Sequence, residues 1–452
     1  MNTTASATRS VAEFVATGHT SVPAAEVEHA VSRLVFDTLV VMLCGRDEPL
    51  PRLVAKHQRS TGGPGRASAA ERAHLLGVMA HIHDFDDYRA LVGHPSAVLV
   101  PTMLAMHEKR PASTPDLVAA YTVGFEVLSR LARYSRGHYE HGFHTSATLG
   151  ALGAACVASR LRSFTAPQVA SALGIAASQA SGLRGAFGSD LKAYQLGRAA
   201  AVGVDAVGLT TTGVVGPGDT LDGESGFLGA FFDDESAALA RRHLAEIRET
   251  PTDELAVITT PPMAKPYPSC GGSHGAIDAA LELHAALGQA DIDSITSVRA
   301  TVPPYYRNAL RHRIPTTGLA GKFSLEYCVA TALVRGSAGL TDFTDEAVTD
   351  PRVLRVADRV VRDYRPEMDD QVMRDLMPAT LECAYDGGTV TRSVVRQSGG
   401  PGALLSDEQL ITKARSNVEP NLSTLVDRVS AAFAADDVAA MLEAAMPALR
   451  RT

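Results

Sequence analysis

Titratable side chains are most densely gathered between residues 81 and 96 of this 452-residue chain. Residues 81–89 read HIHDFDDYR, and His94 and Ser96 follow a few positions later. Burying so many ionisable groups at the end of an apolar helix is costly, so they are either solvated or used. One use is proton transfer, in which the carboxylate of Asp84 and the imidazole of His94 meet across a loop.

Three other interpretations of this segment stay open. His81 and His83 could bind a metal ion only if the helix has already ended, because residues i and i+2 face apart on a helix. Residues 84–87 also match the Asp-x-Asp-Asp motif of some terpene cyclases, but tryptophan is absent, aromatic residues make up 5% of the chain, and no second acidic motif follows. The simplest alternative is a solvated helix end.

Three further residues have types and neighbours that suit the binding of a carboxylate. His144 and His274 each stand at the expected start of a helix, where backbone N–H groups favour anions. His274 follows a Pro-rich loop with Gly271 and Gly272, which permit a close approach of the backbone. Lys192 lies in a helical run of small residues, and it needs a partner unless its ammonium reaches solvent.

Lysine is used sparingly in this chain. Only six of the 42 basic residues are lysine, and the rest are arginine. Each lysine is therefore a candidate for a position that needs a compact ammonium group. The six are Lys56, Lys109, Lys192, Lys265, Lys322 and Lys413.

The elements that carry these residues are predicted to be mainly helical. Ser21 to Pro23 resembles a helix cap, residues 24–44 form a predicted helix that stops at Gly45, and residues 72–84 form another. Residues 147–181 are rich in Ala, Gly and Ser. Because small residues let helices approach closely, we expect the packed centre of a helical domain there.

The sequence pattern changes near residue 254. Prolines interrupt the helical pattern, residues 297–302 alternate like a strand, and residues 379–385 and 389–395 predict a hairpin. A capping box formed by Ser406 and Gln409 begins the closing helices. We predict a mainly α fold, with a large all-helical domain and a smaller α+β lid domain. The predicted limits are 1–254 for the helical domain, 255–400 for the α+β domain and 401–452 for C-terminal helices that return to the helical domain.

The composition of the chain argues against several kinds of protein. Hydrophobic residues make up 45% and charged residues 20%, which suits a folded core. A net charge of −8 without a basic block argues against a nucleic-acid partner. Residues 39–44 are the longest apolar run, far short of the about 20 residues needed to span a bilayer, and residues 1–9 lack an apolar signal segment. Five scattered cysteines fit neither a disulfide framework nor a zinc ribbon. We therefore expect a cytoplasmic protein without a membrane partner.

Seven segments, taken in order, resemble the MmgE/PrpD family, which includes 2-methylcitrate dehydratase, cis-aconitate decarboxylase and iminodisuccinate epimerase. The segments are HDFDD (83–87) with HPS (94–96), GFH (142–144) with TLG (148–150), ASALGIAASQASG (170–182), Lys192 with GRAA (197–200), GFL (226–228), KPYPSCGGSH (265–274) and KFSLEY (322–327). The resemblance implies a large helical domain with a smaller α+β lid domain, and an active site between them. It also implies a homodimer and no metal or organic cofactor.

By position, the resemblance places five residues on the family's active site, with Tyr327 nearby. We predict that these five are catalytic: Asp84, His94, His144, Lys192 and His274. Clustered cations, Lys192 with the two histidines His144 and His274, would neutralise negative charge that builds on a substrate carboxylate. His94, oriented by Asp84, would deliver or collect the proton. Substrate contacts are predicted for Tyr88, Arg89, Ser96, Gln195, Ser273 and Tyr327.

Three positions depart from the family's pattern. Tyr88 stands where the family often has Thr, Arg89 where it has a bulky His or Trp, and Gln195 where it commonly has His. A substrate of the size of methylcitrate therefore does not follow from the resemblance.

The sequence predicts a lyase that acts next to a carboxylate of a small di- or tricarboxylic acid. Dehydration, decarboxylation and epimerisation all need stabilisation of a carbanion-like state, so the residues do not choose among them. Dehydration is placed first because dehydratase is the commonest name in the family that the chain resembles, and the other two reactions are the alternatives. A relative that has lost catalysis and serves in binding or assembly is the rival from a different class, and a metal-dependent hydrolase is a further one.

Overall fold

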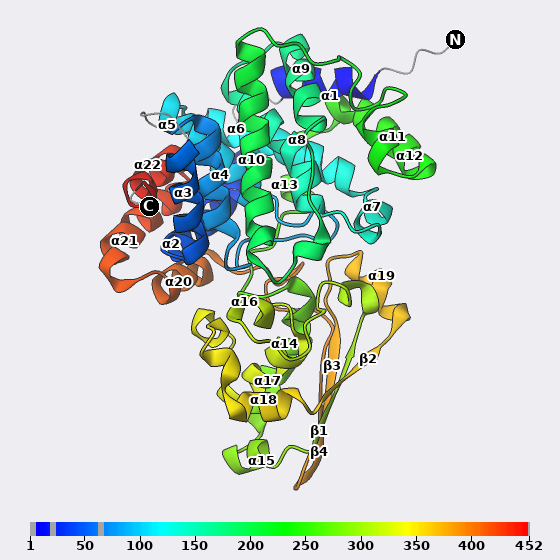
Figure 1. Cartoon of the computed structure of the whole chain (residues 1–452), viewed down its shortest axis with the longest axis vertical. Helices are drawn as coiled ribbons and strands as arrows, with labels where there is room; N and C mark the ends of the chain where they lie inside the picture. Colours follow the sequence, from blue (N-terminus) through cyan, green and yellow to red (C-terminus); the bar gives the residue numbers. More distant parts are fainter. Residues whose placement is uncertain (1–5, 19–23, 62–66, 451–452) are drawn as a thin grey trace.

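The computed structural model of the chain describes residues 6–18, 24–61 and 67–450, and it has two parts. In Figure 1 the helices up to α13, together with α20–α22, form the upper part, and a β-sheet with α14, α17 and α18 forms the lower part. The predicted fold class, mainly α with a smaller α+β domain, is confirmed.

The upper part consists of helices from both ends of the chain. These are α1 (Ala7–Thr17), α2 (Ala25–Gly45), α3 (Pro49–Thr61), α4 (Ala69–His81), α5 (Ser96–Lys109), α6 (Thr114–Ala132), α7 (Arg136–Glu140), α8 (Thr145–Leu161), α9 (Ala166–Ala177), α10 (Asp190–Thr211), α11 (Phe227–Phe231), α12 (Asp234–Ala245), α13 (Ala256–Thr259), α20 (Asp407–Asn417), α21 (Ser423–Ala434) and α22 (Val438–Leu449).

The lower part combines short helices with a four-stranded sheet. Its elements are α14 (His274–Ala286), α15 (Gln289–Asp293), β1 (Ser297–Val302), α16 (Gly318–Gly321), α17 (Leu325–Arg335), α18 (Pro351–Ala357), β2 (Val360–Tyr364), α19 (Asp369–Val372), β3 (Ala379–Tyr385) and β4 (Gly388–Val394).

Small residues let the central helices of the upper part approach closely. A Cβ atom added to Gly77 of α4 would lie 2.7 Å from the Cα atom of Gly197 in α10. One added to Gly203 of α10 would lie 2.4 Å from the Cβ atom of Ala154 in α8. These contacts leave no room for larger side chains. The contact at Ala154 confirms the prediction for α8, which is buried through Ser159, whereas the later part of the stretch rich in Ala, Gly and Ser includes exposed positions such as Ser178 and Gln179.

The sheet has the order β2-β1-β3-β4, in which β1 and β2 are parallel and the other pairs are antiparallel. The predicted strand at 297–302 and the first strand of the hairpin at 379–385 are confirmed, and the second runs from Gly388 to Val394. β2 was not predicted. Only Val360 of its five residues is buried, so the strand lacks the alternation that marks a half-buried strand.

Two hydrophobic cores correspond to the two parts. One contains buried side chains from residues 7–257 and 410–449, and the other contains Phe187 with residues 270–394. The closing helices therefore pack on the helical part, and Ser406 with Gln409 forms the expected capping box of α20. The domain limits at residues 254 and 400 stay predictions. Within the described ranges, none of the helices combines the length and apolar character that crossing a bilayer requires.

The helix predicted over residues 72–84 ends earlier than expected. α4 begins at Ala69, behind a capping box of Ser68 and Glu71, and ends at His81. Asp84 adopts a left-handed conformation with φ +51°, which a helix cannot contain. The chain therefore leaves the helix before the polar cluster, and this exit turns the cluster toward the other part of the molecule. The cap predicted at Ser21 to Pro23 lies outside the described residues.

Candidate active site

A cavity with about 530 Å³ of empty space, part of it open to solvent, lies where the two parts of the molecule meet. Aromatic side chains form much of its wall, and four of the five predicted catalytic residues lie on it: Asp84, His94, His144 and Lys192. The remaining lining residues are Tyr88, Arg89, Leu91, Gly93, Tyr139, Thr145, Ser146, Phe187, Cys270, Gly271, Tyr305, Tyr306, Ala309 and Phe323.

Three buried lysines hold the loop that follows α4. The backbone carbonyl oxygen of His83 accepts a hydrogen bond from Lys322 at 3.0 Å. That of Asp84 accepts one from Lys265 at 2.8 Å, and that of Phe85 accepts one from Lys413 at 2.9 Å. Three successive carbonyl groups thus bind ammonium groups from three distant segments, which fixes the left-handed turn at Asp84. The sparing use of lysine was the signal for these positions, although it did not distinguish them from the exposed Lys56 and Lys109.

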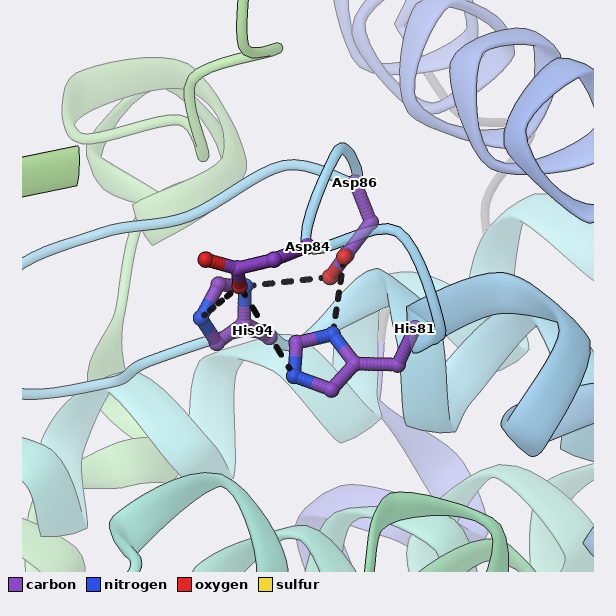
Figure 2. Close-up of side chains that lie close together, drawn as sticks. All are labelled: His81, Asp84, Asp86 and His94. Carbon is purple, nitrogen blue, oxygen red and sulfur yellow. Dashed lines mark hydrogen bonds and ion pairs between the residues drawn. The ribbon is translucent and has the colours of Figure 1, made fainter. Parts of the chain in front are cut away.

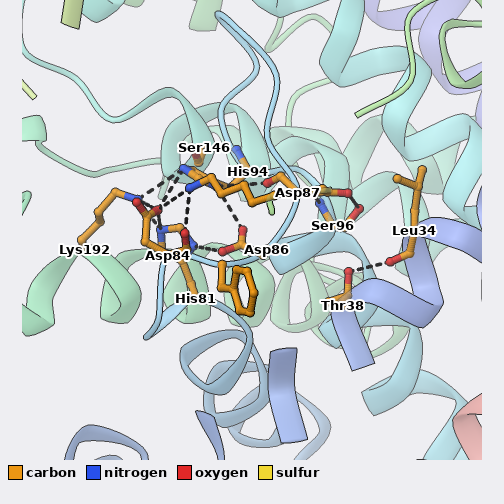
Figure 3. A network of polar contacts seen from close by, with 12 residues as sticks. Leu34, Thr38, His81, Asp84, Asp86, Asp87, His94, Ser96, Ser146 and Lys192 are labelled. Atoms are coloured by element: carbon orange, nitrogen blue, oxygen red, sulfur yellow. Dashed lines mark hydrogen bonds and ion pairs between the residues drawn. The ribbon is translucent and has the colours of Figure 1, made fainter. Parts of the chain in front are cut away.

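Lys192 of α10 is the centre of the polar wall, as Figure 3 shows. Its Nζ atom donates to Oδ1 of Asp84 at 2.8 Å and to Nε2 of His81 at 2.6 Å, and it lies 3.3 Å from Nε2 of His94. Burial lowers the pKa of Lys192, and the Asp84 carboxylate opposes that shift. Burial alone would raise the pKa of Asp84, but Lys192 and Lys265 hold it well below its ordinary range. Asp84 is therefore ionised and compensates the buried ammonium groups.

Asp86 orients two imidazole rings at once (Figure 2). Its Oδ1 atom lies 2.8 Å from Nδ1 of His81, and its Oδ2 atom lies 3.0 Å from Nδ1 of His94. Because Nδ1 of His94 is also 3.1 Å from the carbonyl oxygen of Asp87, that nitrogen faces only acceptors and carries the hydrogen. The Nε2 atoms of both rings are then lone-pair acceptors that face Lys192. Sequence reasoning expected Asp84 to orient His94. In the structure Oδ1 of Asp84 lies 3.5 Å from Nε2 of His94, and Asp86 adds a second carboxylate contact at Nδ1 that the sequence did not predict.

The two rings are neutral at neutral pH. Burial, followed by the nearby Lys192 ammonium, lowers the pKa of His94 to about 3. Burial also lowers the pKa of His81, against the opposing influence of Asp86. A neutral His94 presents an Nε2 lone pair beside a proton-bearing ammonium group. This is the geometry of a proton relay.

His144, the N-cap residue of α8, presents a second free nitrogen to the cavity. Its Nδ1 atom is 2.8 Å from Oε1 of Gln195, whose amide nitrogen donates to the carbonyl oxygen of Leu183 at 3.2 Å. These two bonds fix the amide orientation, so Nδ1 of His144 carries the hydrogen. The Nε2 atom is buried and has no hydrogen-bond partner among the described residues. Burial and Lys192 hold the pKa of His144 well below its usual value, so that Nε2 is a free base. Gln195 lies behind His144 and does not line the cavity.

His274, the fifth predicted catalytic residue, lies outside the cavity wall. It is fully buried, its Nε2 atom is 3.2 Å from the carbonyl oxygen of Ser269, and its ring meets the edge of Tyr88 at 5.8 Å between centroids. Burial, followed by Lys265, lowers its pKa to about 3. Tyr88, which contacts this imidazole, lines the cavity, and His274 does not. The buried Nδ1 atom of His274 has no hydrogen-bond partner among the described residues, and its catalytic role stays a prediction.

Three of the predicted substrate contacts are also buried away from the cavity. Ser96 bonds to Asp87 and to Tyr121, Ser273 bonds to the carbonyl oxygen of Cys270, and the Tyr327 hydroxyl bonds to the carbonyl oxygen of Asp342. These partners use the polar atoms that a substrate would need. The side chains are buried because their helices pack there, a relation that motif position does not reveal.

Tyr88 and Arg89, by contrast, do line the cavity. The guanidinium of Arg89 is 3.0 Å from Oδ2 of Asp375 and also bonds to the carbonyl oxygen of Thr260, so its charge is largely compensated. The ring of Tyr88 packs against Gly271, where an added Cβ atom would lie 2.5 Å from the ring. Tyr88 therefore sets the width of the cavity, and Gly271 makes room for it.

The histidine and aspartate cluster was also considered as a metal site. Ligand atoms of His81, Asp84, Asp86 and His94 all lie within 4.8 Å of one another. The Nζ atom of Lys192 lies 2.6 Å from His81 and 2.8 Å from Asp84, so an ammonium group already supplies the positive charge to these atoms. These four side chains could bind a metal ion only if the ammonium group of Lys192 moved away. That the active site works without a metal ion stays a prediction from the sequence.

Sequence reasoning missed several residues of this site. Asp86 and Lys265 stand inside recognised motifs and His81 lies just before one, but the roles of these residues depend on which atoms face each other. Tyr139, Tyr305 and Tyr306 line the cavity from segments with no motif.

Comparisons with known proteins agree with this architecture. The MmgE/PrpD N-terminal domain matches residues 9–240, and the MmgE/PrpD C-terminal domain matches residues 267–436. The chain is 26% identical to Cis-aconitate decarboxylase of Homo sapiens, over 86% of this chain and 83% of the relative. It is 25% identical to Cis-aconitate decarboxylase-like protein oryM of Aspergillus oryzae, over 86% of each, and 27% identical to Cis-aconitate decarboxylase of Aspergillus terreus, over 70% of this chain and 68% of the relative.

Proposed function

Because the chain belongs to the MmgE/PrpD family, a family of enzymes, we propose that it is a lyase that removes carbon dioxide from a small, unsaturated di- or tricarboxylic acid. The observation that carries this proposal is the buried ammonium of Lys192, placed on the cavity wall within 3.3 Å of the Nε2 atom of His94. Decarboxylation stands ahead of the dehydration that the sequence placed first, because the named relatives above are cis-aconitate decarboxylases and a decarboxylase-like protein.

The residues supply both requirements of a decarboxylation. Breaking the bond to the departing carboxylate leaves its electron pair on the remaining carbon skeleton, next to a second carboxylate. Lys192 stabilises that negative charge electrostatically. Thr145 and Ser146, at the N-terminus of the 17-residue helix α8, line the same cavity and add the positive end of a helix dipole.

A proton must then replace the lost carbon dioxide. In the proposed path, Lys192 passes a proton to Nε2 of His94, and the imidazolium passes it to carbon. Asp86, 3.0 Å from Nδ1, stabilises the imidazolium while it exists. Burial, the largest cause of the lowered pKa of His94, also favours transfer of the proton from the imidazolium to carbon.

Dehydration is the second candidate, and one observation favours it. The free Nε2 atom of His144 is a buried base that faces the cavity, and a dehydratase needs such a base to remove a proton next to a carboxylate. Epimerisation would use the same base without loss of a group. A homodimer, a cytoplasmic location and independence of cofactors stay predictions from the sequence.

Proton NMR in heavy water tests the proposal and separates the reactions. The chain is added to cis-aconitate, 2-methylcitrate, citrate and an iminodisuccinate-like acid in turn. New vinyl signals together with released carbon dioxide support decarboxylation. A new vinyl signal without carbon dioxide indicates dehydration, and exchange of a C–H signal alone indicates epimerisation. If a chain shown to be folded changes the spectrum of none of the four acids, the proposal that it is a lyase of these substrates is contradicted.

A further inference from the structure

Two further cavities flank the inner cavity described above, and they differ in charge. The first shares Arg89 and Leu91 with it and is lined by five carboxylates: Glu126, Glu246, Glu249, Glu254 and Asp375. Three arginines, Arg89, Arg130 and Arg133, oppose them. Arg89 also closes this side, because its guanidinium is bound to Asp375 and to Thr260. A polyanion approaching from here meets an excess of negative charge.

The second cavity has the opposite balance. It is lined by Arg136, Arg184 and Arg307 with Asn308, against only Glu140 and Asp369, and we call it the arginine vestibule. Both of its acids are already engaged. Glu140 accepts from Arg136 at 2.9 Å, and Asp369 accepts from the backbone N–H of Tyr305 at 3.0 Å.

Two arginines of the vestibule are therefore not matched by an acid. The side chain of Arg307 is exposed and has no hydrogen bond or ion pair to any residue that the structure describes, while its backbone N–H donates to the carbonyl oxygen of Pro304. The guanidinium carbon of Arg184 lies 4.2 Å from the centre of the Tyr139 ring, and this side chain bonds to Tyr139 and to the carbonyl oxygen of Glu140, with no ion pair to an acid among the described residues. Arginine pairs with carboxylates through two parallel hydrogen bonds, so these two side chains suit a polycarboxylate.

A pair of stacked tyrosines separates the vestibule from the inner cavity. Tyr139 and Tyr305 line both, and their rings are nearly parallel, 5.3 Å apart with an angle of 13° between planes. Tyr139 belongs to α7 of the helical part. Tyr305 belongs to the short 3-10 helix Pro304–Tyr306 of the α+β part. The wall between the two cavities is thus itself a contact between the two parts of the molecule.

We propose that the arginine vestibule is the access site for the anionic substrate, where Arg184 and Arg307 bind a di- or tricarboxylate before it passes the Tyr139–Tyr305 pair into the inner cavity. This proposal rests on the proposed function for its ligand class, since a polycarboxylate is the ligand that the two arginines and the inner cavity share. It assigns the two tyrosines as the gate and the acid-lined cavity as the side that anions avoid.

The absence of tryptophan from the sequence allows a direct test of access. Tyr305→Trp keeps an aromatic ring at the gate and introduces a single fluorescent reporter. Binding of propane-1,2,3-tricarboxylate, a saturated acid that cannot lose carbon dioxide through a double bond, is followed by stopped-flow fluorescence. The Arg184→Gln/Arg307→Gln pair is then added to this reporter chain. The matched control is Arg392→Gln/Arg428→Gln, which removes the same charge outside all three cavities.

At an ionic strength of about 0.01 M, we expect the arginine pair to lower the association rate constant at least about tenfold relative to the control pair, and the difference to shrink as ionic strength approaches about 1 M. Equal rates for the two pairs would overturn the proposal. So would calorimetry that finds no binding of the tricarboxylate to the unaltered chain. Turnover is measured separately by NMR. If association depends on the two arginines but no turnover is found, the proposed reaction is contradicted and the proposed access site is supported. If turnover is found but the two pairs associate at equal rates, the access site is contradicted and the reaction is supported.

Discussion

The Nε2 atom of His94 faces the Nζ atom of Lys192 at 3.3 Å, on the wall of the inner cavity. This pair joins a proton-bearing cation to a neutral imidazole whose other nitrogen is held by Asp86. The relay that we propose depends on both ends of this arrangement, and each end can be removed separately.

Replacing the imidazole is the first test of the relay. His94→Ala should lower kcat by about 100- to 10,000-fold, the usual cost of removing a general acid or base. Activity is measured by NMR, and circular dichroism confirms that the variant is folded. His141→Ala is the control, because His141 is exposed outside the cavity and should leave kcat unchanged. A folded His94→Ala chain with normal turnover would refute the role.

Asp86→Asn should lower kcat without unfolding the chain. The amide keeps the shape but cannot accept hydrogens from Nδ1 of both His81 and His94, so at least one ring turns away or changes tautomer. Asp87→Asn is the matched control. Burial raises the pKa of Asp87 well above its ordinary value, and its side chain bonds to Ser96 and to neither histidine, so Asp87→Asn makes the same change of residue type outside the imidazole pair. Similar losses of kcat in the two variants would mean that Asp86 is only structural.

Gln195→Glu should change the pH profile of kcat. A carboxylate next to Nδ1 of His144 raises the pKa of that imidazole, so Nε2 becomes protonated at a higher pH. We expect the acidic limb of the profile to move toward neutrality in this variant. Gln179→Glu adds the same charge at an exposed position and should leave the profile in place. An unshifted profile in both would show that the free Nε2 atom is not needed.

Gly271→Ala tests the packing that sets the width of the cavity. The added Cβ atom would lie 2.5 Å from the Tyr88 ring, and overpacking of this kind costs about 1–3 kcal/mol of unfolding free energy. Tyr88→Ala in the same chain should recover most of that loss, as a double-mutant cycle in urea would show. Gly185→Ala, with no atom within 4 Å of its added Cβ, is the control. If the changes in unfolding free energy of the two substitutions simply add, the contact between Gly271 and the Tyr88 ring is contradicted.

Buried neutral histidines predict that the chain loses stability in acid. Burial lowers the pKa of His83, His94 and His274 to about 3 in each case, whereas the unfolded chain has an ordinary value near 6.5. Between these values the unfolded state binds more protons. The unfolding free energy therefore decreases as pH falls from about 6.5 toward 3, by up to about 1.4 kcal/mol per pH unit for each histidine.

Urea unfolding at pH 7, 6 and 5 measures this slope. His274→Gln should reduce it, and His141→Gln, at an exposed position, should not. A stability that is equal at pH 7 and pH 5 would show that these imidazoles are not held neutral in the folded chain.

The contacts between segments were easier to predict from the sequence than the contacts between individual atoms. Asp84 and Lys192 are 108 residues apart, and motif order together with the cost of burying a lysine brought both to one site, where the structure places them 2.8 Å apart. His274 stands in an equally recognisable motif, yet it does not line the cavity and packs instead against Tyr88, which does. A motif gives the neighbourhood of a residue, and side-chain packing decides its access. Their catalytic roles stay predictions.

The pairing of His94 with Asp86 could not be predicted for a related reason. Asp84, Asp86 and Asp87 are near neighbours in sequence, and any of them could have reached the imidazole. The left-handed turn at Asp84 decides the matter, and that turn depends on lysines far along the chain. Local periodicity instead continued the helix to residue 84, because periodicity cannot register a tertiary contact.

Those lysine contacts imply an order of events during folding. The carbonyl group of Asp84 accepts from Lys265, which lies 181 positions later in the chain. Those of His83 and Phe85 accept from Lys322 and Lys413, which lie 239 and 328 positions later. Closing such long loops is entropically costly and slow. The turn that aims Asp84 at Lys192 thus gains its last anchor only once α20, near the C-terminal end, has docked. Because α20 also contributes Leu410 and Ala414 to the helical core, the same docking step that completes this core fixes the turn at Asp84.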